Sequence, residues 1–95
     1  MDFHEARKVS AWNKARPIPG YDPAVWRQDA FGDTILWSDY GKRTEFGWEI
    51  DHQLPQSKYP FLTWNMSNLR ALHWKNNRSK SDRTDVLAVL GSYPH

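Results

Sequence analysis

Cysteine is absent from the 95 residues of this chain. Disulfide bonds and zinc sites built on thiolates are therefore excluded. Long apolar runs are also absent, because no stretch approaches the ~20 apolar residues that a helix needs to cross a bilayer. The first seven residues, Met-Asp-Phe-His-Glu-Ala-Arg, lack the basic-then-apolar order of a secretory signal. We therefore expect no membrane segment and, by default, a cytoplasmic location.

The chain is rich in aromatic residues for its size. They make up 15% of the sequence and include six tryptophans. A chain of this length is expected to form one small domain with a limited core. We expect the tryptophans to fill that core, since each ring buries a large apolar area. Stacking on nucleobases is the alternative use of such rings.

Positive charge is concentrated in one segment. The net charge of the chain is +2, but residues 70–83 contain five basic residues and one acidic residue. The rest of the chain is slightly acidic. A basic segment of this kind indicates a localised anionic partner such as phosphate, and the alternative is a solvated helix face.

Capping residues, prolines, glycines and the spacing of apolar residues indicate the secondary structure. The chain is predicted to form, in order, a helix over 2–14, an extended connector over 16–20, a short helix over 22–32, a strand within 33–39, a turn over 40–43, a strand over 44–52, a long loop over 53–67, a strand over 69–72, a helix over 74–81 and a final short helix from 82 or 84. The 22–32 helix rests on Asp22 as N-cap, Pro23 in the first turn and Gly32 as the stop. Together these elements predict an α+β fold.

The predicted order of strand, loop, strand and helix allows chemically competent side chains to meet. Phosphodiester hydrolysis needs a base that deprotonates water, and histidine suits this task because its unperturbed pKa is about 6.5. It also needs positive charge at the transition state and the leaving oxygen, which a hard divalent cation held by oxygen ligands supplies. His52 offers the base, and Asp51 and Asn77 offer the oxygens.

Three short segments carry a resemblance to a known family. Asp51-His52 ends one predicted strand, Asn68-Leu69 leads into the next, and Asn77-Arg78-Ser79-Lys80 lies on the predicted helix. This order resembles the HNH motif, also called the ββα-metal or His-Me finger fold, over residues 47–82. Residues 75–82 are also similar to the matching part of the HNH domain in RNA-guided bacterial nucleases. Parts of residues 20–41 carry a weaker likeness to compact bacterial HNH proteins.

The resemblance implies a single domain over residues 1–95, with a ββα-metal core at 44–83, flanking short helices, and an N-terminal helix and extended arm at 1–20. It implies that His52 is the general base that activates water. Asp51 and Asn77 would ligate one divalent metal ion, most readily Mg²⁺, with Mn²⁺ or Ni²⁺ as substitutes. Asn68 would brace the loop and orient His52 through hydrogen bonds.

The resemblance also bears on the remaining polar residues of this segment. Four basic residues are predicted phosphate contacts, each with a solvated side chain as the alternative: Arg70, Lys75, Arg78 and Lys80. Many HNH proteins carry cysteines of a structural zinc site at the positions of His73 and Asn76. Since neither cysteine is present, we expect no structural zinc and interpret His73 as structural or substrate-facing.

The predicted function is that of an HNH endonuclease, a metal-dependent phosphodiester hydrolase that cuts DNA with low sequence preference. RNA is the alternative substrate. One active site per chain indicates nicking by a monomer, unless the protein acts as a homodimer. An immunity protein is expected as a partner only if the chain is an exported toxin. The alternative function is an HNH-fold nucleic-acid-binding or inhibitory protein that is catalytically weak or inactive.

Overall fold

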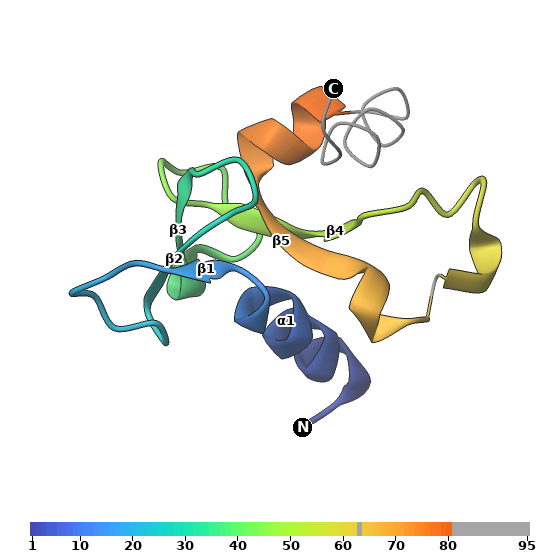
Figure 1. Ribbon diagram of the computed structural model, residues 1–95, viewed down its shortest axis with the longest axis horizontal. Helices are drawn as coiled ribbons and strands as arrows, with labels where there is room; N and C mark the ends of the chain where they lie inside the picture. Colours follow the sequence, from blue (N-terminus) through green and yellow to red (C-terminus); the bar gives the residue numbers. More distant parts are fainter. Residues whose placement is uncertain (63, 81–95) are drawn as a thin grey trace.

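Two antiparallel sheets and two α-helices make up the part of the chain that a computed structural model describes, residues 1–62 and 64–80 (Figure 1). The α+β class predicted from the sequence is confirmed. The elements, in chain order, are α1 (Phe3–Asn13), β1 (Arg16–Pro17), β2 (Trp26–Gln28), β3 (Thr34–Leu36), β4 (Trp48–His52), β5 (Leu69–His73) and a helical segment over residues 74–80. The predicted final helix, from 82 or 84 onward, lies outside the described residues. No helix in the described part is both long and apolar enough to span a membrane.

Helix α1 begins and ends close to its predicted bounds. The carboxylate of Asp2 caps it by accepting a hydrogen bond from the Glu5 amide at 2.7 Å. The helix buries Ala11 and Trp12, and it packs chiefly on β5 and β4. Its fixed N-terminus matters for the site described below, because α1 brings Arg7 to the end of β4.

The predicted helix over 22–32 is wrong, because this segment forms one turn and then a strand. Asp22 does make the expected capping contact, since its Oδ1 accepts from the Ala24 amide at 2.9 Å. The chain then leaves the helical path at Trp26 and pairs with β3 around a turn over residues 29–33. Gly32 adopts a φ of +89° in that turn, which glycine does without steric cost. Asp22 and Pro23 suit a turn as well as the start of a helix, and the pairing of β2 with β3 selects the turn.

The second sheet is a hairpin of β4 and β5 joined by a long connection. His52 lies opposite Leu69, Asp51 opposite Arg70 and Trp48 opposite His73. β4 starts four residues later than predicted, because Gly47 donates back to the Thr44 carbonyl and closes a turn there. The connection contains two single 3-10 turns, at Pro60–Leu62 and Met66–Asn68.

The two faces of this hairpin pack against different helices. Figure 1 shows α1 on one side of it and the helix of residues 74–80 on the other. Trp48, Leu69 and Ala71 lie in the apolar core with α1. The alternate residues Glu49, Asp51 and Arg70 face the second helix and carry charge. This alternation follows from the two-residue period of a strand.

Trp12, Trp37 and Trp48, three of the six tryptophans, form the centre of the apolar core. Trp48 is fully buried, and its ring centroid lies 5.1 Å from that of Trp12 and 5.8 Å from that of Trp37. Tyr40 packs edge-on against Trp48. Trp64 departs from the expectation, because it is 70% exposed in the β4–β5 connection.

Candidate functional site

A cleft of about 400 Å³ opens at the carboxyl end of β4. Its walls include the three side chains that the sequence predicted to meet, Asp51, His52 and Asn77. Asp51 and His52 are the last two residues of β4. The helix that carries Asn77 starts directly after β5, beside Trp48 at the other end of β4, and runs back over the hairpin. The remaining wall residues are Ile50, Pro55, Gln56, Ser57 and Lys80.

Asp51 is a buried carboxylate with a cation on each oxygen. Its Oδ2 accepts from Arg70 Nε at 2.9 Å, and its Oδ1 lies 3.1 Å from Lys80 Nζ. Asp51 and Lys80 are both more than nine-tenths buried, so their ion pair offsets part of the cost of removing each charge from water. Arg70 and Lys80 are predicted phosphate contacts, but in the structure both pair with Asp51.

His52 lies half-buried at the end of β4, with two donor groups at its ring. Gln56 Nε2 is 3.0 Å from the ring Nε2, and Arg7 Nη2 is 3.5 Å from the same atom. The same Gln56 nitrogen also lies 3.3 Å from the ring Nδ1, so it faces both ring nitrogens of His52. Two donor groups therefore lie beside an imidazole whose nitrogens can exchange the donor and acceptor roles.

Asn77 and Arg78 bind the same glutamate on β4. Asn77 Nδ2 donates to Glu49 Oε1 at 2.8 Å, and Arg78 Nη2 donates to Oε2 at 2.9 Å. Partial burial alone would raise the pKa of Glu49, but these two hydrogen bonds and the charges of Arg78 and Arg43 hold that pKa below its usual value. Because the Glu49 carboxylate accepts a hydrogen bond from the amide nitrogen of Asn77, it fixes the orientation of that amide group.

The neighbouring Asn76 points to a different part of the molecule. Its Nδ2 donates to Asp29 Oδ2 at 2.8 Å and to Asp33 Oδ2 at 2.6 Å, and it does not line the cleft. Asn76 therefore bonds to the β2–β3 turn, whereas the adjacent Asn77 lines the cleft with Asp51 and His52.

Asn68 ties the start of the long connection to its end. The side chain is buried and bonds both backbone groups of Leu54, accepting from the amide at 2.9 Å and donating to the carbonyl at 3.1 Å. The Asn68 carbonyl accepts from the Gln53 amide. These bonds hold the backbone immediately after His52. Asn68 thus braces the loop through the two residues that follow His52.

His73 occupies a structural position at the start of the second helix. Its Nδ1 accepts from the Lys75 amide at 3.1 Å, so its Nε2 carries the proton that it donates to the Glu45 carbonyl at 2.7 Å. Both ring nitrogens are used in this way, and the residue is buried. Of the two interpretations offered for His73, this geometry fits the structural one.

Lys75 and Arg78 lie on the exposed side of the second helix. Lys75 is exposed, with its ammonium 5.6 Å from the centroid of the Trp74 ring. The Arg78 side chain is 54% exposed and pairs with Glu49. Both positions are accessible to a polyanion, in contrast to buried Lys80.

Sequence reasoning missed two residues that organise this region. Asp29 is almost fully buried, and its oxygens accept from four donors: the amides of Phe31, Asp33 and His73 and the side chain of Asn76. It pins the start of the second helix to the β2–β3 turn, and the nearby Gly32 was the signal for that turn. Arg7 reaches His52 from α1, 45 residues away, and no local pattern marks it.

Within residues 1–62 and 64–80, no group of three or more His, Cys, Asp or Glu side chains is arranged as a metal site. Asp51 with the amide oxygen of Asn77 is a set of two hard oxygen donors, which suits a cation that keeps most of its water. Comparison of the chain with models of known protein families, with curated proteins and with solved structures finds no match.

Proposed function

We propose that this protein is a metal-dependent endonuclease of the HNH type that hydrolyses phosphodiester bonds in DNA. One observation carries the proposal: Asp51, His52 and Asn77, from two separate segments, line a single cleft. The antiparallel strands β4 and β5, followed at once by a helix that crosses them, support a ββα-metal core. The accessible cations Lys75 and Arg78 on that helix support a polyanionic substrate.

His52 is the general base in this proposal. Its imidazole takes a proton from water, the water oxygen attacks phosphorus, and the bond from phosphorus to the leaving 3′ oxygen breaks. The leaving oxygen then takes up a proton from solvent. The bonds from Asn68 to Gln53 and Leu54 fix the backbone beside His52, so the base keeps its position during the reaction.

Asp51 and Asn77 would hold the divalent ion in the same cleft. The donor set fits, because a carboxylate and an amide oxygen are ligands that Mg²⁺ accepts alongside water and substrate oxygens. The ion would supply positive charge to the phosphate and the leaving oxygen. Glu49 fixes Asn77 through the amide nitrogen, so the amide oxygen is the atom left for ligation.

A second candidate function follows from the ion pairs of Asp51. Arg70 and Lys80 already neutralise both of its oxygens, so a metal ion must displace at least one of these contacts. If that exchange does not occur, the protein binds DNA through its basic surface without turnover. The two functions differ in one measurable respect, which is strand scission in the presence of a divalent ion.

The test is incubation of supercoiled plasmid with the full chain, with and without Mg²⁺ or Mn²⁺. We expect metal-dependent relaxation, and His52→Ala should reduce the rate by ~10²–10⁴-fold, the usual contribution of a general base. His4→Ala is the matched control, because His4 is an exposed histidine on α1. Open circles would indicate nicking by one site, and linear product would indicate paired sites.

Two outcomes would count against the nuclease. Full activity in His52→Ala would remove the proposed base. A folded protein that shifts DNA on a gel, but does not cut it whichever metal ion is added, would favour the binding function.

A further inference from the structure

Two exposed aromatic rings meet near the candidate base. Phe3 lies in the first turn of α1, and Trp64 lies far along the chain in the β4–β5 connection. The two residues are 51% and 70% exposed, and their ring centroids are 5.6 Å apart at an interplanar angle of 46°. Large apolar residues that are exposed singly are ordinary, whereas two that meet from distant segments form a shared surface. These rings contribute little to the core and are accessible to a ligand.

Arg7 connects this pair of rings to His52. Its guanidinium carbon lies 5.8 Å from the centroid of the Phe3 ring and 6.0 Å from that of Trp64, within the range of cation–π attraction. Its Nη2 lies 3.5 Å from the His52 ring Nε2. No carboxylate within residues 1–62 and 64–80 forms an ion pair with Arg7. A ligand on the two rings would therefore lie one side chain from the proposed base, beside an uncompensated positive charge.

The chemistry of this surface fits a nucleobase. Exposed aromatic side chains bind bases by stacking, and arginine adds a cation–π contribution. The charge of Arg7 suits a ligand that carries a phosphate next to its flat, largely apolar base. Stacking tolerates any sequence because every base has a π face, which agrees with the low sequence preference expected of this chain. A base inside a duplex is already stacked on both faces, so the base concerned must be unpaired.

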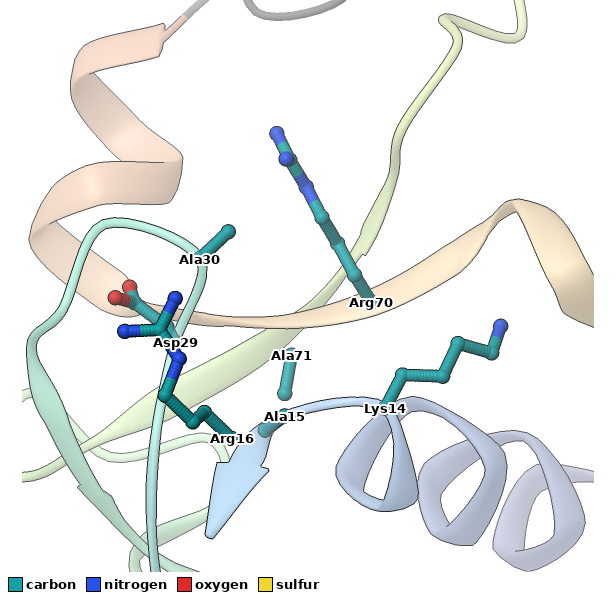
Figure 2. A pocket seen from close by; sticks show the side chains of 7 residues that line it. All are labelled: Lys14, Ala15, Arg16, Asp29, Ala30, Arg70 and Ala71. Carbon is teal, nitrogen blue, oxygen red and sulfur yellow. The ribbon is translucent and has the colours of Figure 1, made fainter. Parts of the chain in front are cut away.

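The opposite end of α1 offers no comparable surface (Figure 2). A cavity of about 280 Å³ lies there, and it is lined by Lys14, Ala15, Arg16, Asp29, Ala30, Arg70 and Ala71. None of these residues has an aromatic ring, and Figure 2 shows the cationic ends of Lys14, Arg16 and Arg70 pointing apart. This region lacks a ring on which a base could stack, so it supplies a charge control that is distant from Phe3 and Trp64.

We propose that Phe3 and Trp64 form a stacking platform for an unpaired nucleobase of the DNA strand held in the cleft. Arg7 links this platform to His52, so the stacked nucleotide lies close to the phosphodiester that is cut. The preferred substrate class is then DNA with unpaired bases at the cutting point, in place of an uninterrupted duplex. The inference rests on the proposed function for the identity of the strand in the cleft.

The test compares two DNA ligands in EDTA, so that no cleavage occurs. Fluorescence anisotropy measures the affinity of the full chain for an end-labelled single strand and for the duplex of the same sequence. Trp64→Ala should weaken single-strand binding by ~5–150-fold, the usual loss for one stacked base, and leave duplex binding nearly unchanged. Phe3→Ala should act in the same direction. Trp64→Phe should keep most of the affinity, because it keeps a ring.

Controls separate stacking from other effects. Tyr21→Ala removes an aromatic side chain from the β1–β2 connection, where Tyr21 is 60% exposed, and should leave both affinities unchanged. Arg16→Gln removes an exposed charge, and any loss that it causes should be similar for both ligands, because both carry phosphates. An abasic single strand keeps its phosphates and has no base to stack, so Trp64→Ala should bind it as well as the parent does.

Three results would overturn the platform, each with the fold intact by circular dichroism. Unchanged single-strand binding in both Trp64→Ala and Phe3→Ala would remove the rings from the binding surface. An equal loss for the single strand and the duplex would show that the rings contact a feature common to both. A parent dimer that becomes monomeric in Trp64→Ala, measured by light scattering, would assign the rings to a second copy of the chain.

Failure of this inference is distinguishable from failure of the nuclease. A protein that cuts plasmid when a metal ion is added, yet binds single strands equally well in Trp64→Ala, is a nuclease without the platform. A protein that loses single-strand affinity in Trp64→Ala, but does not cut DNA whichever metal ion is added, has the platform without the activity.

Discussion

The two faces of the β4–β5 hairpin differ in what they contribute. The face toward α1 is apolar and closely packed, with Trp48, Leu69 and Ala71 all buried. The face toward the second helix carries ion pairs, among them those of Asp51 and Glu49. Along β4, Trp48 therefore packs in the core, whereas the alternate residues Glu49 and Asp51 form ion pairs. This division lets a chain of 95 residues combine an apolar core and a row of ion pairs on a single pair of strands.

The largest effect on stability is expected at the apolar face. Trp48→Ala removes a fully buried ring that contacts Trp12, Trp37 and Tyr40. The free energy of unfolding should fall by ~3–5 kcal/mol, enough to unfold much of a small domain. Urea denaturation followed by circular dichroism measures this. Trp64→Ala, at an exposed position, is the control and should change it by less than ~0.5 kcal/mol.

Asp51 tests whether the charged face also contributes to stability. Asp51→Ala removes the carboxylate that Arg70 and Lys80 both contact, and Lys80 is buried. A loss of about 3 kcal/mol is expected, at the lower end of values for a broken buried pair, because Arg70 keeps some access to solvent. Thermal and urea unfolding measure it. A stability equal to the parent would show that solvent compensates both cations, and the contrast between the two faces would then be sharper.

Asn68 tests the link between the connection and the site. Asn68→Ala leaves both backbone groups of Leu54 without their partner inside a buried region. The loss in unfolding free energy should be ~1–3 kcal/mol. Asn65→Ala is the control, since Asn65 is exposed and its side chain accepts from the nearby Ser67. Hydrogen exchange should show faster exchange at the Gln53 and Leu54 amides in the Asn68 variant alone.

The smallest effect is expected at Glu49, and it depends on pH. The pKa of Glu49 is lowered in the folded protein, so its charge stabilises the fold above the pKa of the unfolded chain, and this stabilisation is lost as pH falls through the folded value. Glu49→Gln should therefore reduce stability at pH 7, by less than ~1 kcal/mol because Arg78 is largely exposed. The difference should close as the pH is lowered. A difference that stays constant with pH would show that packing, not charge, is the cause.

The sequence was a good guide where a local pattern specifies the structure. The Asp2 cap located α1 to within a residue. The partial alternation of polar and apolar residues located the end of β4 at His52 but began the strand four residues early. It was a poor guide at residues 22–32, where Asp22, Pro23 and Gly32 fit either a helix or a turn followed by a strand. Only pairing of Trp26–Gln28 with β3 decides between these, and that pairing depends on residues after the turn.

The sequence by itself determined which chemical groups this protein has and their order: Asp51-His52 at a strand end, Asn68 before a strand and Asn77 on a helix. The tertiary structure decided their partners. It placed Arg70 and Lys80 on Asp51, Arg7 and Gln56 on His52, and Glu49 on Asn77. The reason is that strand and helix periods fix which face a residue occupies, whereas contacts between faces depend on how distant segments pack.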